Sequence, residues 1–204
     1  LQLALYWPDI HSDQALQIGQ IQNLATPNET IEQLITTKLL QWQDKTQLAF
    51  TPPLLQRVLA SLNPPSRQRY VHRMLALQLE QKQRGKTPFE IKARLAYHWC
   101  AAGEQEKAAD LYLRCGQSAL QQRCYADAAH CLGAALKLDT SVDFSLELRV
   151  TLLNDLAQSR IMAFGYGDLY AFKAASEALQ LAKQVADETA SFRSLYLLFL
   201  GIGS

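Results

Sequence analysis

The sequence has no hydrophobic run long enough to cross a membrane and no excess of charge of either sign. Its longest apolar runs, such as residues 195–200, fall far short of the roughly 20 residues that a spanning helix needs. With 20 lysines and arginines against 19 aspartates and glutamates, the net charge is +1. This balance gives no electrostatic argument for nucleic acid, an anionic membrane surface or a strongly acidic partner.

Cysteine is scarce, and its spacing does not suit a metal site. The four cysteines, Cys100, Cys115, Cys124 and Cys131, lie 15, 9 and 7 positions apart and form no Cys-x-x-Cys pair. We expect reduced thiols that occupy small core positions. The apolar residues 1–5 have no charged start and no cleavage site, so no signal peptide is predicted and the cytoplasm is the expected location.

Signatures of catalysis and of nucleotide binding are also missing. The sequence has no Gly-x-x-x-x-Gly-Lys-Ser/Thr loop for phosphate. Residues 165–168, Gly-Tyr-Gly-Asp, lack the third glycine of a dinucleotide fingerprint and predict a helix break with Asp168 as the next cap. His11, Ser12 and Asp13 are contiguous, whereas a triad is assembled from separate elements, so Ser12 or Asp13 is expected to cap a helix. We therefore predict no enzymatic activity, no catalytic residue, no metal site and no cofactor.

Before the prolines at residues 64–65, the expected elements are short and mixed. A short helix is expected at residues 14–18, and a second begins at Thr26-Pro27 and places its apolar residues on one face. Residues 40–43 and 47–50 alternate apolar and polar around Asp44-Lys45, which predicts a hairpin, and a helix follows at 54–62. This order, helix, helix and hairpin, is that of a winged helix-turn-helix.

After the two prolines, helical periodicity dominates to the end of the sequence. Breaks are expected at Gly103, near Arg123, at residues 139–141 and at residues 165–167. The expected helices cover residues 67–84, 89–102, 104–122, 124–138, 144–164, 168–186 and 189 to the end.

Residues 95–138 carry small and aromatic residues at the spacing of paired antiparallel helices. The pattern comprises Leu95, Ala96, Trp99, Gly103, Ala108, Tyr112, Cys115, Tyr125, Ala128, Leu132 and Ala135. It resembles tetratricopeptide repeats, whose helices approach closely where small residues lie at the crossing. Because Ala108 and Ala128 are only 20 positions apart, we expect an irregular helical solenoid and not a regular array.

Residues 50–73, followed by residues 95–108, carry a second likeness. This order resembles the region behind the ATPase core in bacterial signal-transduction ATPases with numerous domains, relatives of the maltose-regulon activator and of ATPase modules fused to cyclases or kinases. The resemblance implies a winged-helix segment that links a nucleotide-binding core to a tetratricopeptide-like sensor. Since the phosphate loop is missing, it does not imply ATP binding by this sequence.

Together these features predict an all-α protein, with a winged-helix-like segment and short hairpin at residues 1–63 and a tetratricopeptide-like solenoid at 64–204. Both ends are apolar and Leu1 replaces an initiator Met, so we expect a piece of a longer protein. The expected function is non-catalytic and regulatory: the repeats bind a small effector or a partner protein and signal to an ATPase or output domain outside this sequence. A scaffold or dimerisation module remains an alternative.

A DNA-binding regulator is the other alternative, on the basic face formed by Arg67, Arg69 and Arg73. Against it, the helix in the reading position of the winged segment carries Glu29 and Glu32, which are ill-suited to phosphate.

If the solenoid binds a ligand, the first helix of each pair is expected to present the polar contacts. The candidate groove residues are Glu90, Arg94, Tyr97, Asn154 and Gln158.

Overall fold

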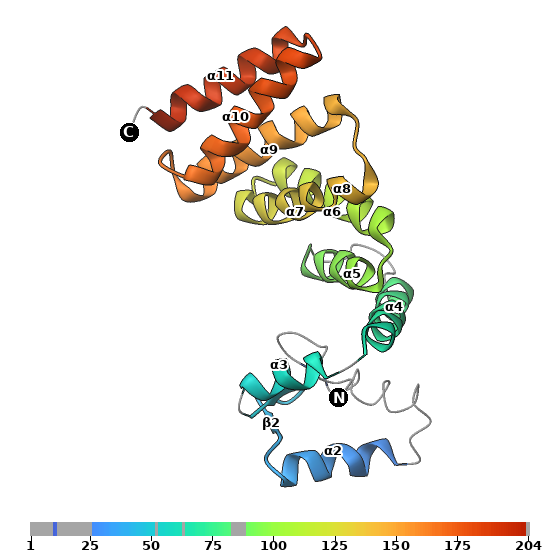
Figure 1. Cartoon of the computed structure of the whole chain (residues 1–204). Coiled ribbons are helices and arrows are strands. Elements are labelled where there is room, and N and C mark those ends of the chain that lie inside the picture. Colours follow the sequence, from blue (N-terminus) through green and yellow to red (C-terminus); the bar gives the residue numbers. More distant parts are fainter. Residues whose placement is uncertain (1–9, 12–25, 52, 63, 83–88, 203–204) are drawn as a thin grey trace. The chain divides into compact units, whose positions relative to one another are not determined.

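The computed structural model describes residues 10–11, 26–51, 53–62, 64–82 and 89–202 (Figure 1). The described chain is mostly helical with one small antiparallel sheet, which confirms the all-α class. It divides into two compact units, Leu1–Met74 and Leu75–Ser204. The sequence placed this division between residues 63 and 64. None of the described helices has the length and apolar composition required to cross a bilayer.

The first unit contains the predicted hairpin. Strands β2 (Leu40–Trp42) and β3 (Gln47–Phe50) pair antiparallel, and β1 (Ile10–His11) pairs with the other edge of β3. The turn forms although Asp-Lys is a poor hairpin sequence, because Asp44 Oδ1 accepts hydrogen bonds from the Thr46 and Gln47 amides at 2.7 and 2.8 Å. The alternation in β3 buries Leu48 and Phe50.

Two helices belong to the same unit. Helix α2 (Pro27–Thr36) precedes the hairpin and α3 (Pro53–Ser61) follows it, close to the bounds expected from the two Pro-initiated starts. The short helix expected at residues 14–18, with Ser12 or Asp13 as its cap, lies outside the described residues. Strand β1 was not predicted, because two residues carry no periodicity from which a strand can be recognised.

The remaining helices begin and end within two residues of their expected bounds. They are α4 (Pro65–Lys82), α5 (Phe89–Ala102), α6 (Gln105–Gln121), α7 (Tyr125–Lys137), α9 (Leu146–Phe164), α10 (Leu169–Gln184) and α11 (Glu188–Ile202).

The predicted breaks are confirmed by backbone geometry: Gly103, Arg123 and Gly165 have left-handed φ angles of 90°, 60° and 97°. The break predicted at residues 139–141 does separate α7 from α9, but the residues there form a short helix that was not predicted, α8 (Asp139–Val142). Its end is fixed by Asp143, which is left-handed at φ 54° and donates its amide to the Asp139 carbonyl at 2.8 Å.

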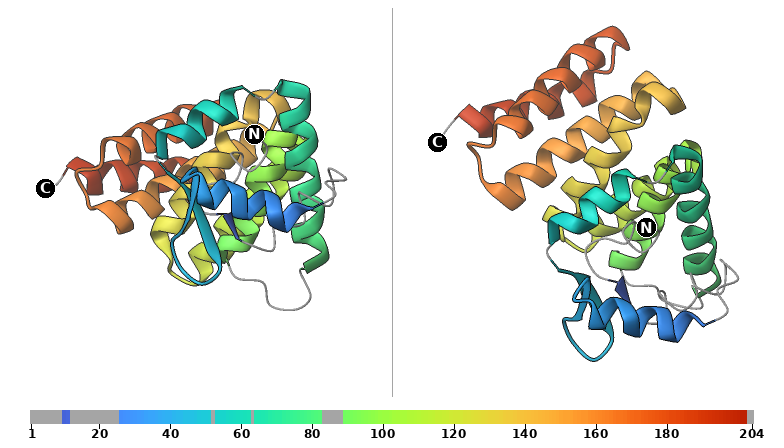
Figure 2. Two further views of the ribbon diagram at one scale, coloured as in Figure 1. Left: turned by 90° about the horizontal axis from the view of Figure 1, so that it is seen from below. Right: turned by 60° about the horizontal axis from the view of Figure 1, so that its bottom comes forward.

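Consecutive helices of the second unit pack side by side, from α5 on α6 to α10 on α11, and α9 also packs on α7 and α11. Both views in Figure 2 show α9, α10 and α11 lying next to one another. Small residues permit these close approaches. The buried side of α10 consists of alanines: Ala171, Ala174, Ala175, Ala178 and Ala182.

A glycine lies where α6 crosses closely over α7. A Cβ atom added to Gly116 would lie 2.7 Å from Leu132 Cδ2 and 2.8 Å from Leu132 Cγ. Leu132 is completely buried. The sequence therefore needs a residue without a side chain at this point, since the core is packed to crystal-like density.

The core of the second unit falls into two clusters. One includes Leu95, Trp99, Tyr112 and Cys131, and the other includes Leu153, Ile161 and Leu197. Trp99 is 2% exposed and donates its indole N–H to Glu80 Oε1 at 2.9 Å, so its polar atom is satisfied inside the core.

Candidate ligand-binding site

A pocket of about 420 Å³ lies between α9 and α11, within the second unit. Its volume is in the range of roughly 300–1,000 Å³ that is usual for small-molecule sites. It is lined by three residues of α9, one residue of the α9–α10 turn and one face of α11. These residues are Gln158, Ile161, Met162, Tyr166, Arg193, Tyr196, Leu197 and Leu200.

A helix cap and an ion pair, both formed by Asp168, fix the turn at one end of the pocket. Asp168 accepts the Ala171 amide at 2.7 Å and so caps α10, as the sequence predicted. The same carboxylate accepts two hydrogen bonds from Arg160, at 2.7 and 2.8 Å. The Arg160 guanidinium holds the pKa of Asp168 below its usual value. This network anchors the turn that carries Tyr166.

The polar side of the pocket is built around Arg193. One terminal nitrogen of its guanidinium donates to Asp155 Oδ1 at 2.7 Å and to Gln158 Oε1 at 2.8 Å. The side chain of Arg193 is 40% exposed and that of Asp155 17%. Arginine carries five N–H donors, and among the described residues no acceptor contacts its Nε or its other terminal nitrogen. Arg193 therefore has donors left for a ligand.

A buried polar pair lies directly behind this cluster. Ser194 Oγ is 2.9 Å from Asn154 Oδ1 and 2.9 Å from the Ala190 carbonyl oxygen. A hydroxyl has one hydrogen and donates to one of these at a time. Asn154 is 1% exposed and Ser194 is fully buried, so the pair joins α11 to α9 beneath the pocket and does not reach into it.

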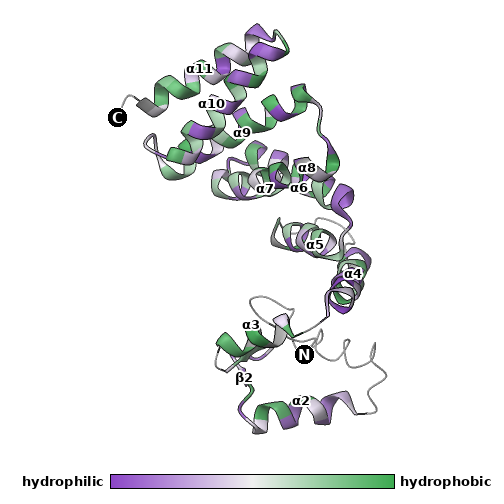
Figure 3. Cartoon of the chain, in the orientation of Figure 1, coloured by the Kyte–Doolittle hydropathy of each residue, from purple (hydrophilic) through white to green (hydrophobic). Residues whose placement is uncertain are grey.

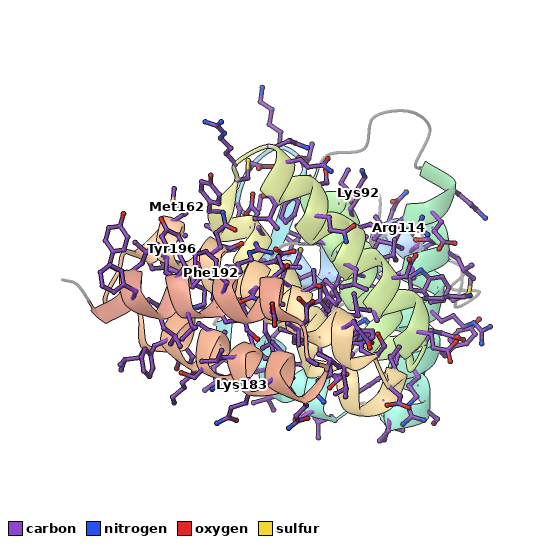
Figure 4. All side chains as sticks on the ribbon, turned by 90° about the horizontal axis from the view of Figure 1, so that it is seen from above. Lys92, Arg114, Met162, Lys183, Phe192 and Tyr196 are labelled. Atoms are coloured by element: carbon purple, nitrogen blue, oxygen red, sulfur yellow. The ribbon has the colours of Figure 1, made fainter. Side chains whose placement is uncertain are left out.

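The mouth of the pocket carries large side chains that are open to solvent. Met162, Tyr166 and Tyr196 are 55%, 52% and 55% exposed. In Figure 4, Met162 and Tyr196 lie on the same side of α11. Large apolar side chains at the mouth of a pocket offer contact area that only a ligand or partner would bury.

Of the predicted groove residues, Gln158 lines the pocket and Asn154 lies buried beneath it. Arg94 and Tyr97 are on α5, which contributes no described residue to the pocket. Tyr97 is 48% exposed, and its ring contacts the His98 ring edge-on. Glu90 is also on α5, but its side chain lies outside the described part.

Arg193 and Tyr196 were not predicted as pocket residues, because ligand contacts were expected only on the first helix of each pair. The signal was present in the spacing of Arg193, Tyr196, Leu197 and Leu200, which places all four on one face of α11.

The core positions expected for the cysteines are confirmed for Cys115 and Cys131, whereas Cys124 is exposed and Cys100 is half-buried. The Cys115 and Cys131 thiols are free and buried on the neighbouring helices α6 and α7. The neighbouring Cys115 thiol and burial raise the pKa of Cys131, while burial lowers the pKa of His72. Among the described residues no three His, Cys, Asp or Glu side chains converge on a metal-sized site.

The comparisons with protein families, with curated proteins and with solved structures found no match for this chain.

Proposed function

We propose that this chain is the non-catalytic regulatory part of a larger signalling protein and that it binds a small effector at the α9–α11 pocket. The observation that carries the proposal is the pocket itself, which combines an open apolar mouth with unused Arg193 donors. These are features of a binding surface. An ATPase or output domain of the same protein would receive the signal.

The arrangement of the elements supports this role. Consecutive packed helices in the second unit agree with a tetratricopeptide-like solenoid, and a helix before a hairpin in the first unit agrees with a winged-helix-like segment. The order resembles that of the bacterial signalling ATPases, in which such parts accompany a nucleotide-binding core. This resemblance supports regulation by binding, which requires no chemistry in the chain.

A ligand in the pocket would act on the packing of α11. The pocket is lined by both α9 and α11, so its occupant contacts two elements at once. If α11 samples more than one arrangement, the ligand shifts the equilibrium toward the arrangement that completes the pocket. The size of the shift equals the difference between the ligand's binding free energies for the two arrangements. The output domain would then respond to the position of α11.

A thermal-shift screen of uncharged, anionic and cationic compounds tests the proposal. The chain is compared with Met162→Trp, which fills the pocket mouth from an exposed position, and with Arg114→Gln, a change at an exposed ion pair on α6. We expect compounds that stabilise the wild type and Arg114→Gln but not Met162→Trp. Finding no compound with this dependence would refute the proposal.

A second candidate function, docking of a protein partner, is favoured by the outer face of α11. Phe192, Leu195 and Phe199 are 73%, 52% and 75% exposed at positions that share one side of the helix. Figure 3 shows the hydrophobic character of this helix. Sedimentation of the wild type and of Phe192→Ser/Phe199→Ser distinguishes the two: loss of a concentration-dependent dimer in the variant supports docking.

A further inference from the structure

We infer that the ligand of the α9–α11 pocket is an uncharged amphiphile, with an apolar body and a carbonyl-type oxygen that accepts hydrogen bonds from Arg193. This inference rests on the proposed function and specifies its ligand class. It depends on three observations: the charge balance of the pocket, the donors that remain on Arg193, and the side chains at the mouth.

The charge balance argues against an ionic ligand. Arg193 is the one charged residue that lines the pocket in the described part of the chain, and Asp155 already contacts it at 2.7 Å. The pair is formally neutral. An anion would approach the Asp155 carboxylate as well as the guanidinium, and a cation would meet Arg193 first. Either ion would also lose its hydration among the apolar walls, and no unpaired charge of opposite sign would offset that cost.

The unused donors argue for an acceptor. Asp155 and Gln158 both bind the same terminal nitrogen of Arg193, so the N–H groups of Nε and of the other terminal nitrogen remain available. An amide or ketone oxygen can accept these hydrogen bonds without carrying a net charge. Hydrogen bonds to a charged donor are stronger than those between neutral groups, so one such oxygen is enough to orient the ligand.

The mouth argues for an apolar body of some size. Ile161, Leu197 and Leu200 form apolar walls, and Met162 and Tyr196 extend them outward as exposed side chains. A thioether and an aromatic ring at this position pack well against alkyl and aryl groups. The ligand is therefore polar at one end and apolar along the rest.

Three analogues with one carbon frame test the inference by calorimetry on the whole chain: phenylbutyramide, phenylbutyrate and phenylbutylamine. We expect the amide to bind about tenfold more tightly than either ion. Tyr196→Ala should weaken amide binding about tenfold, whereas Phe172→Ala, which changes an exposed aromatic of α10 outside the pocket lining, should leave it unchanged. If either ion binds as tightly as the amide, or if both alanine variants weaken binding equally, the inference is overturned.

A reversal experiment isolates the charge argument. Asp155→Asn keeps an oxygen for Arg193 but removes the carboxylate, so the guanidinium becomes an unpaired cation and phenylbutyrate should bind more tightly than phenylbutyramide. Asp110→Asn, the matched change at the exposed Arg114–Asp110 pair, should preserve the wild-type preference. An unchanged preference in Asp155→Asn overturns the inference, provided that the circular dichroism spectrum remains that of the wild type. If that variant does not fold, the order of the three analogues by affinity for the wild type decides whether the inference holds.

The two proposals fail separately. If the screen yields compounds that depend on Met162 but all carry a net charge, the ligand class is wrong and the regulatory pocket stands. If Met162→Trp changes no binding event, both proposals are refuted.

Discussion

Replacing Gly116 with alanine should destabilise the second unit, although alanine is the better helix former. Gly116 lies inside α6, and a Cβ at this position would approach Leu132 Cδ2 to 2.7 Å. Alanine gains about 0.5–1 kcal/mol in helix propensity, but forcing an extra methyl group into a packed core costs about 1–3 kcal/mol. The clash therefore outweighs the propensity, and the expected net loss is on the order of 1 kcal/mol.

Gly133 provides a matched control inside the neighbouring helix. A Cβ there would lie 3.9 Å from Leu156 Cδ1, an ordinary contact. Gly133→Ala should therefore stabilise the chain by about 0.5–1 kcal/mol from propensity alone. The difference between the two alanine variants measures the overpacking at Leu132.

Urea unfolding is the assay, followed by the fluorescence of Trp99, which is buried in the second unit. Trp7 and Trp42 are replaced by phenylalanine, so that the signal reports one unit. In a Leu132→Ala background the clash partner is gone and Gly116→Ala should become stabilising. A Gly116→Ala variant as stable as Gly133→Ala would refute the packing argument.

Two further predictions concern polar pairs around the pocket. Asp168→Asn should lower the free energy of unfolding at pH 7 by about 1–2 kcal/mol, because it removes the charge that pairs with Arg160. The pKa of Asp168 is lowered in the folded chain. Its contribution to the free energy of unfolding is therefore present above about pH 4 and is lost as the pH falls through the folded pKa. Urea titrations at several pH values should show that wild type and variant become equally stable in acid. Ser194→Ala should cost about 1–3 kcal/mol, because it removes a partner of buried Asn154. Asn154→Leu combined with Ser194→Ala should cost less than the sum of the single changes, as a double-mutant cycle will measure.

The helices were predictable because their ends carry chemical signals. Pro27 and Pro53 begin helices, Gly103 and Gly165 follow helices at positive φ, and Asp168 caps α10. These effects act within a few residues, so the sequence displays them directly. The winged-helix and solenoid assignments concern how helices are arranged, and they remain predictions.

The short helix α8 was missed for a local reason. Asp139-Thr140-Ser141 has the composition of a loop, since such side chains compete for backbone hydrogen bonds. In the structure the Asp139 side chain bonds to groups beyond the short helix: Oδ1 accepts the Phe144 amide at 3.2 Å and Oδ2 pairs with Arg149 at 3.0 Å. The partner Arg149 lies ten positions away, beyond the range of the pattern.

The site was only partly predictable, since it joins α9 to α11 across more than 30 positions of sequence. Periodicity identifies the apolar face of each helix but does not say which helix it will meet. Gln158 was identified because it is polar on a predicted helix; Arg193 was not, because its role depends on Asp155 and Gln158 lying opposite it.

The two polar pairs between α9 and α11 explain why this pocket has a defined shape. Arg193 and Ser194 are adjacent on α11, and they bond to Asp155 and Asn154, which are adjacent on α9. A displacement of α11 by one helical turn would separate both pairs at once and leave Asn154 buried without Ser194. Apolar contacts alone would tolerate such a shift, because they are not directional. The pairs therefore select one register of α11, and the same Arg193 that fixes the register also lines the pocket, with N–H groups that Asp155 and Gln158 do not use. A ligand that accepts hydrogen bonds from those donors must stabilise this register over any other. Ligand binding would therefore fix the position of α11 for any domain that α11 contacts.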